Sequence, residues 1–388
     1  MFLSDTHLPQ LLSPEAYTDR SWFDHEIGSV LSPAWQLVTT LAEIPRVGDF
    51  VTGRLLGHDV IVHRTEDGPR AFLNVCPHRL SLLTGLPRGH QCRLTCQYHG
   101  WEFASDGSTR RIPDAPGFRP LEKGALGLRR LQCGTLGQLV FVRLVDGDVP
   151  LGGMFGERLA DVERAVAGRH RLVVSWARDV GANWKVIVEN NLESYHVGVV
   201  HRATLGSMPD EERCDHEFSP VHSRFRAPGG VAGPVGDWQR ALLRRSGLEP
   251  SGTYHHCLFL PNLTVLWMDD IAAVQTFEPT APDRTRVTFR GFALRGERPT
   301  PLSGGLLAWA ARRHLLFWKR VWEEDLRLFP DLQAGLANPV RPSNGLLSRR
   351  EERIHHFQRW IRDRVGAGHP VGVGQDGIET WKTGEVSA

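Results

Sequence analysis

The spacing of apolar and polar residues divides the chain into a β-rich first part and a mixed second part. Before Ser32-Pro33, apolar residues recur among polar ones at helical spacing, which predicts a helical arm over residues 1–35. From residue 36 to residue 150 the apolar runs are short, and turn sequences such as Glu66-Asp67-Gly68-Pro69 separate them. Strands are predicted over residues 59–63, 70–75, 98–103 and 138–144. The first part is therefore predicted to be an all-β module.

The second part, residues 151–388, mixes helical and strand patterns. Shorter apolar runs predict strands over residues 264–267, 274–277 and 286–294. The segment 227–237 is rich in Gly and Pro and predicts a surface loop. Helices are predicted over residues 154–168, 185–200, 306–329 and 347–365. The pattern as a whole predicts an α+β chain, in which an all-β module precedes a larger α+β domain.

Composition excludes several classes of protein. The chain has 388 residues, with 46 Lys and Arg against 44 Asp and Glu, so it lacks the basic excess of a nucleic-acid-binding protein. No apolar run approaches the roughly 18 residues of a membrane span, and Asp5 near the start argues against a signal peptide. The six cysteines are too few for a disulfide scaffold in a chain this long. We therefore expect a cytoplasmic protein whose cysteines are reduced thiols or metal ligands.

Two Cys–His pairs form the first candidate site. They are Cys76-Pro77-His78 and Cys96-Gln97-Tyr98-His99, and each sits at the end of a predicted strand. Zinc is one candidate ion, because two cysteines and two histidines are a familiar zinc ligand set. In zinc fingers, however, both cysteines come from one knuckle and both histidines from a helix. Here each loop supplies one of each, which favours a two-iron cluster with thiolates on one iron and imidazoles on the other.

A second candidate site lies between Asn183 and His201. Glu193 and His196 are three residues apart and share one face of a helix. His196 and His201 are five apart, about 140° around an ideal helix, so they cannot share that face. The helix must bend or end near Gly198 if both bind one metal. Taken alone, the pair is weak evidence for a metal site, and two unrelated core or surface histidines are the more common explanation.

These motifs occur in an order that resembles the α, or terminal oxygenase, subunits of Rieske non-haem iron oxygenases. The shared sequences are Cys-Pro-His-Arg, Cys-Gln-Tyr-His-Gly-Trp, Asn-Trp-Lys and an acid–x–x–His–x₄–His segment. The resemblance covers nearly the whole chain. It implies an all-β Rieske domain over residues 36–150, then an α+β catalytic domain over residues 151–388 with a central antiparallel sheet covered by helices.

The resemblance also implies the ligands of a Rieske [2Fe–2S] cluster. Cys76 and Cys96 would hold one iron, and His78 and His99 the other. One residue departs from the family pattern: Leu80 stands where the family has glycine, which puts in doubt any backbone conformation that needs glycine.

The resemblance further implies that His196 and His201 bind a mononuclear Fe(II). The third ligand of such a facial triad is a carboxylate from a late helix, and Asp325 matches best, with Glu324 and Asp331 as alternatives. Glu193 takes the place of a bridging carboxylate, commonly aspartate, that links this site to a Rieske histidine of a neighbouring subunit in a trimer. Asn190 is expected to line or support the site, as are Asn191 and Tyr195.

The resemblance implies an oxygenase that receives electrons through the cluster and activates O₂ at the mononuclear iron. The electrons would come from NAD(P)H through a separate flavin/iron–sulfur reductase or a ferredoxin, since the chain has no G-x-G-x-x-G fingerprint of its own. A homotrimer is expected, whereas the sequence leaves a β subunit undetermined, and no nucleic acid or membrane partner is expected.

The glutamate at position 193 resembles family members that act on quaternary ammonium compounds, and thus favours hydroxylation or demethylation of an amine or quaternary ammonium substrate. Aromatic residues on the predicted sheet form either a cation–π cage or ordinary core: Tyr254, Phe259, Trp267 and Phe277. Two alternatives stay open, an aromatic-ring hydroxylating dioxygenase and a Rieske electron carrier without its own catalysis.

Overall fold

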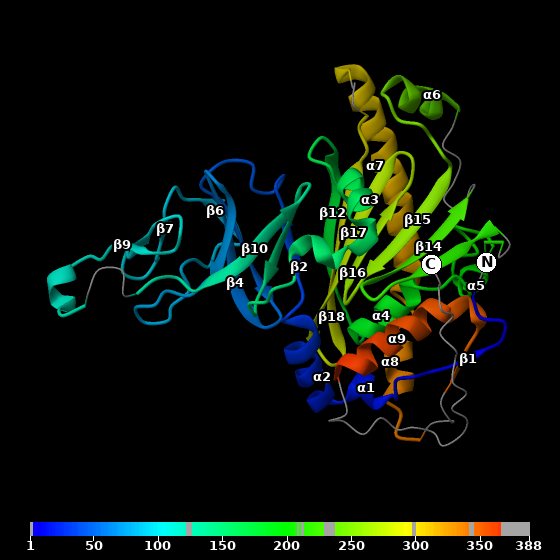
Figure 1. Cartoon of the computed structure of the whole chain (residues 1–388), viewed down its shortest axis with the longest axis horizontal. Coiled ribbons are helices and arrows are strands. Elements are labelled where there is room, and N and C mark those ends of the chain that lie inside the picture. Colours follow the sequence, from blue (N-terminus) through cyan, green and yellow to red (C-terminus); the bar gives the residue numbers. More distant parts are fainter. Residues whose placement is uncertain are drawn as a thin grey trace, which may run out of the picture.

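The computed structural model describes residues 3–121, 126–207, 209–210, 213–228, 237–296, 300–340 and 345–365. Two seven-stranded antiparallel sheets dominate it, and Figure 1 shows them side by side along the long axis of the molecule. The first sheet belongs to the β-rich part of the sequence and the second to the mixed part. Within the described residues, no helix combines the length and the apolar character needed to cross a bilayer.

The first sheet has the strand order β2-β11-β10-β5-β4-β3-β6. A smaller sheet, β7-β8-β9, extends from it toward the far end of the molecule (Figure 1). The strands of the two sheets are β2 Gln36–Thr40, β3 Asp49–Leu55, β4 His58–Thr65, β5 Gly68–Leu73, β6 Arg88–His90, β7 Leu94–Thr95, β8 Glu102–Phe103, β9 Thr109–Arg111, β10 Arg130–Leu136 and β11 Leu139–Arg143. The predicted strands 59–63, 70–75 and 138–144 are confirmed within a residue or two. The strand predicted over 98–103 is wrong for residues 98–101, because residues 97–99 form a turn and β8 begins only at Glu102.

The second sheet has the strand order β12-β18-β17-β16-β15-β14-β13. Its strands are β12 Arg171–Val180, β13 Asp215–Phe218, β14 His222–Pro228, β15 Thr253–Phe259, β16 Leu263–Trp267, β17 Ile271–Ala281 and β18 Arg284–Ala293. One face packs on the long helix α7, Pro301–Asp325, through Leu266, Phe289 and Leu315. The other face packs against the first sheet, where Phe259 joins Phe141 in one apolar cluster.

Helices cover the lower edge of the second sheet in Figure 1. They are α1 Glu15–Thr18, α2 Arg20–Glu26, α4 Trp184–Asn191, α8 Phe329–Leu336 and α9 Glu352–Val365, and a π-helical turn, Ile27–Leu31, continues α2. Short strands β1 (Leu8–Pro9) and β19 (Leu346–Leu347) pair with each other, which fixes the start of the chain to the segment before α9. The predicted helical arm therefore packs on the second part of the chain.

Several helix predictions need correction. The predicted helix 185–200 is wrong as a single element: α4 ends at Asn191, and a four-residue helix, α5 (Val197–Val200), follows a turn. The Glu193 side chain accepts the backbone N–H groups of Tyr195 and His196, and these bonds replace helical ones.

The remaining helices also differ from their predicted bounds. The region 154–168 forms two 3₁₀ turns and α3, Leu159–Ala165, and the region 306–329 is divided between α7 and α8. In the predicted loop 227–237, residues 227–228 continue β14, residues 229–236 lie outside the described part of the chain, and Asp237 begins α6, Asp237–Arg245. The sequence analysis did not predict α6.

A fully buried ion pair joins the N-terminal arm to α4. Lys185 Nζ lies 2.8 Å from Glu26, which also accepts the indole N–H groups of Trp22 and Trp184 at 2.8 and 3.1 Å. Both charged side chains are inaccessible to solvent. The Asn-Trp-Lys sequence that begins α4 thus anchors the helix that carries the second candidate site.

Candidate functional site

The two Cys–His loops have matching backbone geometry. Cys76 donates its N–H to Ser81 and accepts the N–H of Leu80, and Cys96 does the same with Trp101 and Gly100. Both residues at the fourth position after cysteine are left-handed, with φ +58° at Leu80 and +68° at Gly100. The conformation that favours glycine is therefore present in the first loop even though leucine occupies the position.

The four candidate cluster ligands come together at the tip of the first part of the chain. The imidazole rings of His78 and His99 have centroids 4.7 Å apart, and Trp101 stacks on His78 at 5.1 Å. Cys76 and Cys96 are buried within the same apolar cluster. Two thiols and two imidazoles converging from paired loops fit the donor set of a Rieske cluster.

The second site forms where α5 meets the end of α7. His196 and His201 flank α5, and their Nε2 atoms are 3.2 Å apart. Asp325 Oδ1 lies 3.1 Å from His201 Nε2 and 3.6 Å from His196 Nε2. These three side chains each place one ligand atom within 4.8 Å of the others, so the structure gathers them at one point.

Carboxylates on the outer side orient both imidazoles. Glu193 accepts the Nδ1–H of His196, and Glu324 Oε2 accepts the Nδ1–H of His201 at 2.8 Å and the hydroxyl of Thr204 at 2.7 Å. Because each ring holds a proton at Nδ1 for its carboxylate partner, its Nε2 atom is the one left to present a lone pair to a metal ion in the interior. This is the carboxylate–histidine arrangement that supports metal ligands in proteins.

A cation accounts for this convergence. Two Nε2 lone pairs and the Asp325 carboxylate cannot donate hydrogen bonds to one another, and the buried Asp325 Oδ1 has no hydrogen-bond donor among the described residues. Such a polar atom is costly to bury unless an ion satisfies it. The residues present therefore fit a 2-His-1-carboxylate iron site. Neither alternative carboxylate is placed as a third ligand. Glu324 hydrogen-bonds to the outer side of His201, and Asp331 lies in the first turn of α8, outside the group formed by His196, His201 and Asp325.

A cavity of about 390 Å³ opens next to the three converging ligands. Asn190, Asn191 and Glu193 line it, whereas Tyr195 is 58% exposed and does not. Of the four aromatic residues considered from the sequence for a cage, Tyr254 lines the cavity, but Phe259, Trp267 and Phe277 pack in the core. Side chains alternate along a strand, so Phe259 and Trp267 face away from the cavity.

Two cavity residues on α7 were missed from the sequence. Trp318 and Trp322 line the cavity, and Tyr254 stacks on Trp318 at a centroid distance of 5.6 Å. Trp318, Trp322 and Asp325 recur at helical spacing, so they occupy one face of α7. The sequence signal that could have found them is this spacing from Asp325. The two tryptophans form an aromatic wall on the same face of α7 as that proposed ligand.

Comparison with known proteins identifies the class of protein that these two sites define. Residues 34–131 match the Rieske [2Fe-2S] domain family, and residues 168–367, more than half of the chain, match the family described as "Ring hydroxylating alpha subunit (catalytic domain)". The chain belongs to this family: it is the α subunit of a Rieske non-haem iron oxygenase, an oxidoreductase. The predicted α+β fold, with an all-β Rieske domain and an antiparallel catalytic sheet, is confirmed.

Two curated relatives and one solved structure illustrate the likeness. The carnitine monooxygenase oxygenase subunit of Escherichia coli K12 is 26% identical over 332 residues, which cover 82% of each chain. The methanesulfonate monooxygenase hydroxylase subunit alpha of Methylosulfonomonas methylovora is 27% identical over 301 residues, covering 73% of this chain and 72% of the relative. A crystal structure of a quaternary ammonium Rieske monooxygenase with L-carnitine aligns with a TM-score of 0.72 at 21% identity, over 91% and 96% of the two chains, and shows the shared fold.

Family membership establishes the cofactors in general terms. They are a Rieske [2Fe–2S] cluster and a mononuclear iron, and NAD(P)H acts through a reductase. Oxygenases of this family take electrons from reductase or ferredoxin partners and form multimers.

Proposed function

We propose that Cys76, Cys96, His78 and His99 hold the Rieske cluster and that His196, His201 and Asp325 hold the mononuclear iron. The convergence of the three ligand atoms, with both Nδ1 protons held by outer carboxylates, carries this proposal. When bound, the two iron groups supply single-electron transfer and O₂ activation. Asp325 contributes the anionic ligand, while Glu193 and Glu324 hold the Nδ1–H groups and so orient the two imidazoles.

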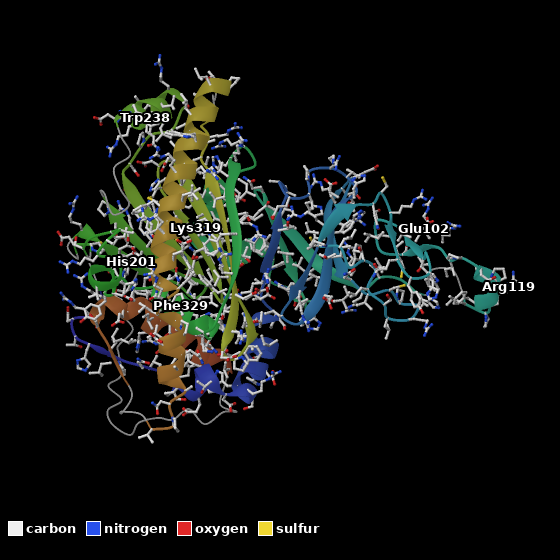
Figure 2. All side chains as sticks on the ribbon, turned by 180° about the vertical axis from the view of Figure 1, so that it is seen from behind. Glu102, Arg119, His201, Trp238, Lys319 and Phe329 are labelled. Atoms are coloured by element: carbon white, nitrogen blue, oxygen red, sulfur yellow. The ribbon has the colours of Figure 1, made fainter. Side chains whose placement is uncertain are left out.

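The proposed electron path runs between subunits of a homotrimer. In Figure 2, Glu102, close to the Cys–His loops, and His201 lie toward opposite ends of the molecule. A Rieske histidine of a neighbouring subunit would instead approach Glu193, which already holds the Nδ1 proton of His196. A carboxylate between two imidazoles fixes both rings and provides a short path for the electron. A separate NAD(P)H-dependent flavin/iron–sulfur reductase, or a ferredoxin, would reduce the cluster.

We also propose a division of the chain into a helical arm over residues 1–35, a Rieske domain over 36–150 and a catalytic domain over 151–388. Strand β11 ends at Arg143, and helical turns begin at Leu151. The cytoplasm is the proposed location, supported by the six cysteines, none of which forms a disulfide within the described part of the chain.

For the substrate, we propose a small organic molecule, an amine or a quaternary ammonium compound, that is hydroxylated or demethylated. Tyr254, Trp318 and Trp322 form an aromatic wall beside the ligand set, and such a wall attracts cations. The carnitine monooxygenase relative supports the same substrate class. An aromatic ring packed against these three side chains is the second candidate, supported by the ring-hydroxylating family description.

The experiment for this proposal combines the iron-replete protein with a surrogate reductase, NADH or NADPH, and a panel of amines, quaternary ammonium compounds and aromatic compounds. O₂ uptake and product mass are scored together, because uncoupled O₂ uptake alone is misleading. We expect an oxygenated or demethylated product from at least one candidate class. Reductant-dependent O₂ uptake without any product across the panel would contradict the proposed substrate classes.

The variant Glu193→Ala tests the proposed bridge. We expect both iron sites to stay occupied while turnover stops, because Glu193 orients His196 and stands on the proposed electron path. Iron content and product formation are measured on the same preparation. An iron-replete, reduced variant that oxidises substrate at the wild-type rate would contradict the bridging role.

A further inference from the structure

A buried arginine lines the same cavity as the proposed iron ligands. Arg353 lies on α9, its side chain points into the second sheet, and only 1% of its surface is exposed. Its Nε donates to Ser223 Oγ at 3.2 Å, and its Nη2 donates to the carbonyls of Ser223 and His256 at 3.3 and 3.4 Å. The guanidinium is thus fixed in place by neutral acceptors on β14 and β15.

No carboxylate of the described residues pairs with this guanidinium. The neighbouring Glu352 accepts backbone N–H groups from Leu3 and Ser4 and the ring N–H of His216. Glu217, on β13, is engaged by Arg158, Arg224 and His222. Burial lowers the pKa of Arg353 to about 10, so the group stays charged at neutral pH. A buried charge without a counter-ion is costly, and a bound anion would relieve that cost.

His256 provides a second donor beside Arg353. Its Nδ1 accepts from Arg353 Nη1 and Nη2 at 3.4 and 3.3 Å, so the ring proton belongs on Nε2. Burial keeps the pKa of His256 well below its usual range, so the ring is neutral. Within the described part of the chain, Nε2 has no hydrogen-bond partner, and the single contact of Arg353 Nη1 is long. Both residues therefore retain N–H groups at the cavity wall.

We propose that Arg353 and His256 form an oxyanion subsite, and that the substrate of this oxygenase carries a carboxylate or sulfonate group. The guanidinium Nη1 would give an anionic oxygen of either group a charge-assisted hydrogen bond, and the Nε2–H of His256 would give a second hydrogen bond. Tyr254 stacks between His256 and Trp318, so an apolar or cationic body of the substrate rests on aromatic rings while the anionic end is held. This inference rests on the proposed function, because the cavity is the substrate site only if His196, His201 and Asp325 hold the catalytic iron.

Equilibrium binding to the iron-replete protein tests the subsite without reductase or turnover. Isothermal titration compares anions with matched probes lacking the anion: benzoate and benzenesulfonate against benzamide, and γ-butyrobetaine against choline. In at least one set we expect the anion to bind at least about tenfold more tightly than its partner. Comparing the affinities of benzoate and benzenesulfonate then identifies whether a carboxylate or a sulfonate is preferred.

Variants assign the preference to the two residues. Arg353→Met is expected to weaken anion binding at least about tenfold and to leave benzamide and choline unaffected. Arg353→Lys keeps the charge and is expected to bind anions more tightly than Arg353→Met. Arg359→Met, at an exposed position on the same helix, is the matched control and is expected to bind like the wild type. Should Arg353→Met fail to fold, His256→Phe keeps the ring but removes its N–H, and weaker anion binding is expected there too.

The inference is overturned if no anionic probe binds at millimolar concentration, or if the probes without the anion bind as tightly as the anions in both sets. It is also overturned if Arg353→Met keeps the preference for the anion. Where Arg353→Met does not fold, the same result with His256→Phe overturns it. Because binding is measured without turnover, these results are separable from the proposed function. The proposed oxygenase function is contradicted when no oxygenated or demethylated product forms. If only the oxyanion subsite is wrong, the oxygenase function is retained and its substrate carries no carboxylate or sulfonate.

Discussion

At the scale of single residues, Leu80 shows how strongly the paired loops constrain the backbone. Its φ of +58° matches the +68° of Gly100 at the equivalent position, although leucine has a Cβ atom that this region disfavours. The side chain is 76% exposed and gains little from packing. The hydrogen bond from Leu80 N–H to Cys76 holds the loop closed. The loop therefore keeps Leu80 in a left-handed conformation that is unfavourable for leucine, next to the proposed cluster ligands.

Leu80→Gly is expected to raise the free energy of unfolding of the Rieske domain by about 0.5–1 kcal/mol, because glycine adopts positive φ without the Cβ penalty. Thermal unfolding followed by the visible absorbance of the cluster measures the change. Leu80→Ala, which keeps the Cβ atom, is the control and should gain little. Equal stabilisation by alanine and glycine would show that backbone strain is not the cause.

The proposed cysteine and histidine ligands were predictable because each motif is short and its residues lie close together along the chain, whereas Asp325 was matched only through the family resemblance. The partners of these ligands were harder to predict. Glu324 contacts His201 from 123 residues away, and Arg353 contacts the cavity from a helix near the end of the chain. Such contacts depend on tertiary packing, which local periodicity does not encode.

At the scale of elements, the shortness of α5 places the two histidines. His196 and His201 lie at its two ends, the backbone leaves the helical conformation at His201 (φ −99°, ψ 23°), and their Nε2 atoms lie 3.2 Å apart. If both histidines bind one metal, the sequence predicts a bend or end near Gly198, and α5 ends close by, at Val200. A second break, at residues 192–196, separates α4 from α5, because the Glu193 carboxylate caps the backbone there.

The position of α4 depends on the buried pair of Lys185 and Glu26. Lys185→Met is expected to lower the free energy of unfolding by about 3 kcal/mol, since it leaves the Glu26 carboxylate buried without its cation. Urea denaturation measures the loss. The double variant Glu26→Gln with Lys185→Met should recover part of it, because no charge is then buried. A double variant no more stable than Lys185→Met would contradict this explanation.

At the scale of the whole molecule, the two proposed metal sites lie toward opposite ends of an elongated chain (Figure 2). The two parts of the chain meet through an apolar cluster and several polar contacts. In one of these, Leu56, in the turn between β3 and β4, donates its N–H to Glu278 on β17 at 2.8 Å. Burial raises the pKa of Glu278 to about 7, so about half of the carboxyl groups are protonated at neutral pH.

This contact predicts a pH-dependent stability. The folded-state pKa of about 7 exceeds the ordinary value of 4.5, so the contribution of Glu278 is fully present below pH 4.5 and is lost as pH rises through 7. Glu278→Gln stays neutral, and its stability relative to the wild type should rise between pH 5 and pH 8, on the order of 2–3 kcal/mol. Denaturant unfolding at both pH values measures it, with the exposed Glu323→Gln as control. An unchanged difference between variant and wild type would contradict the buried carboxyl.

The central claim is that His196, His201 and Asp325 hold the catalytic iron, separate from the Rieske cluster. Iron analysis of wild type and Asp325→Ala, together with the visible and electron paramagnetic resonance spectra of the cluster, tests it most directly. We expect about three irons per chain in the wild type and about two in Asp325→Ala, with unchanged Rieske spectra. Glu324→Gln, the adjacent residue on α7, should keep most of the third iron because it still has an oxygen to accept from His201. Three irons in Asp325→Ala, or loss of the cluster spectrum instead of the third iron, would contradict the assignment.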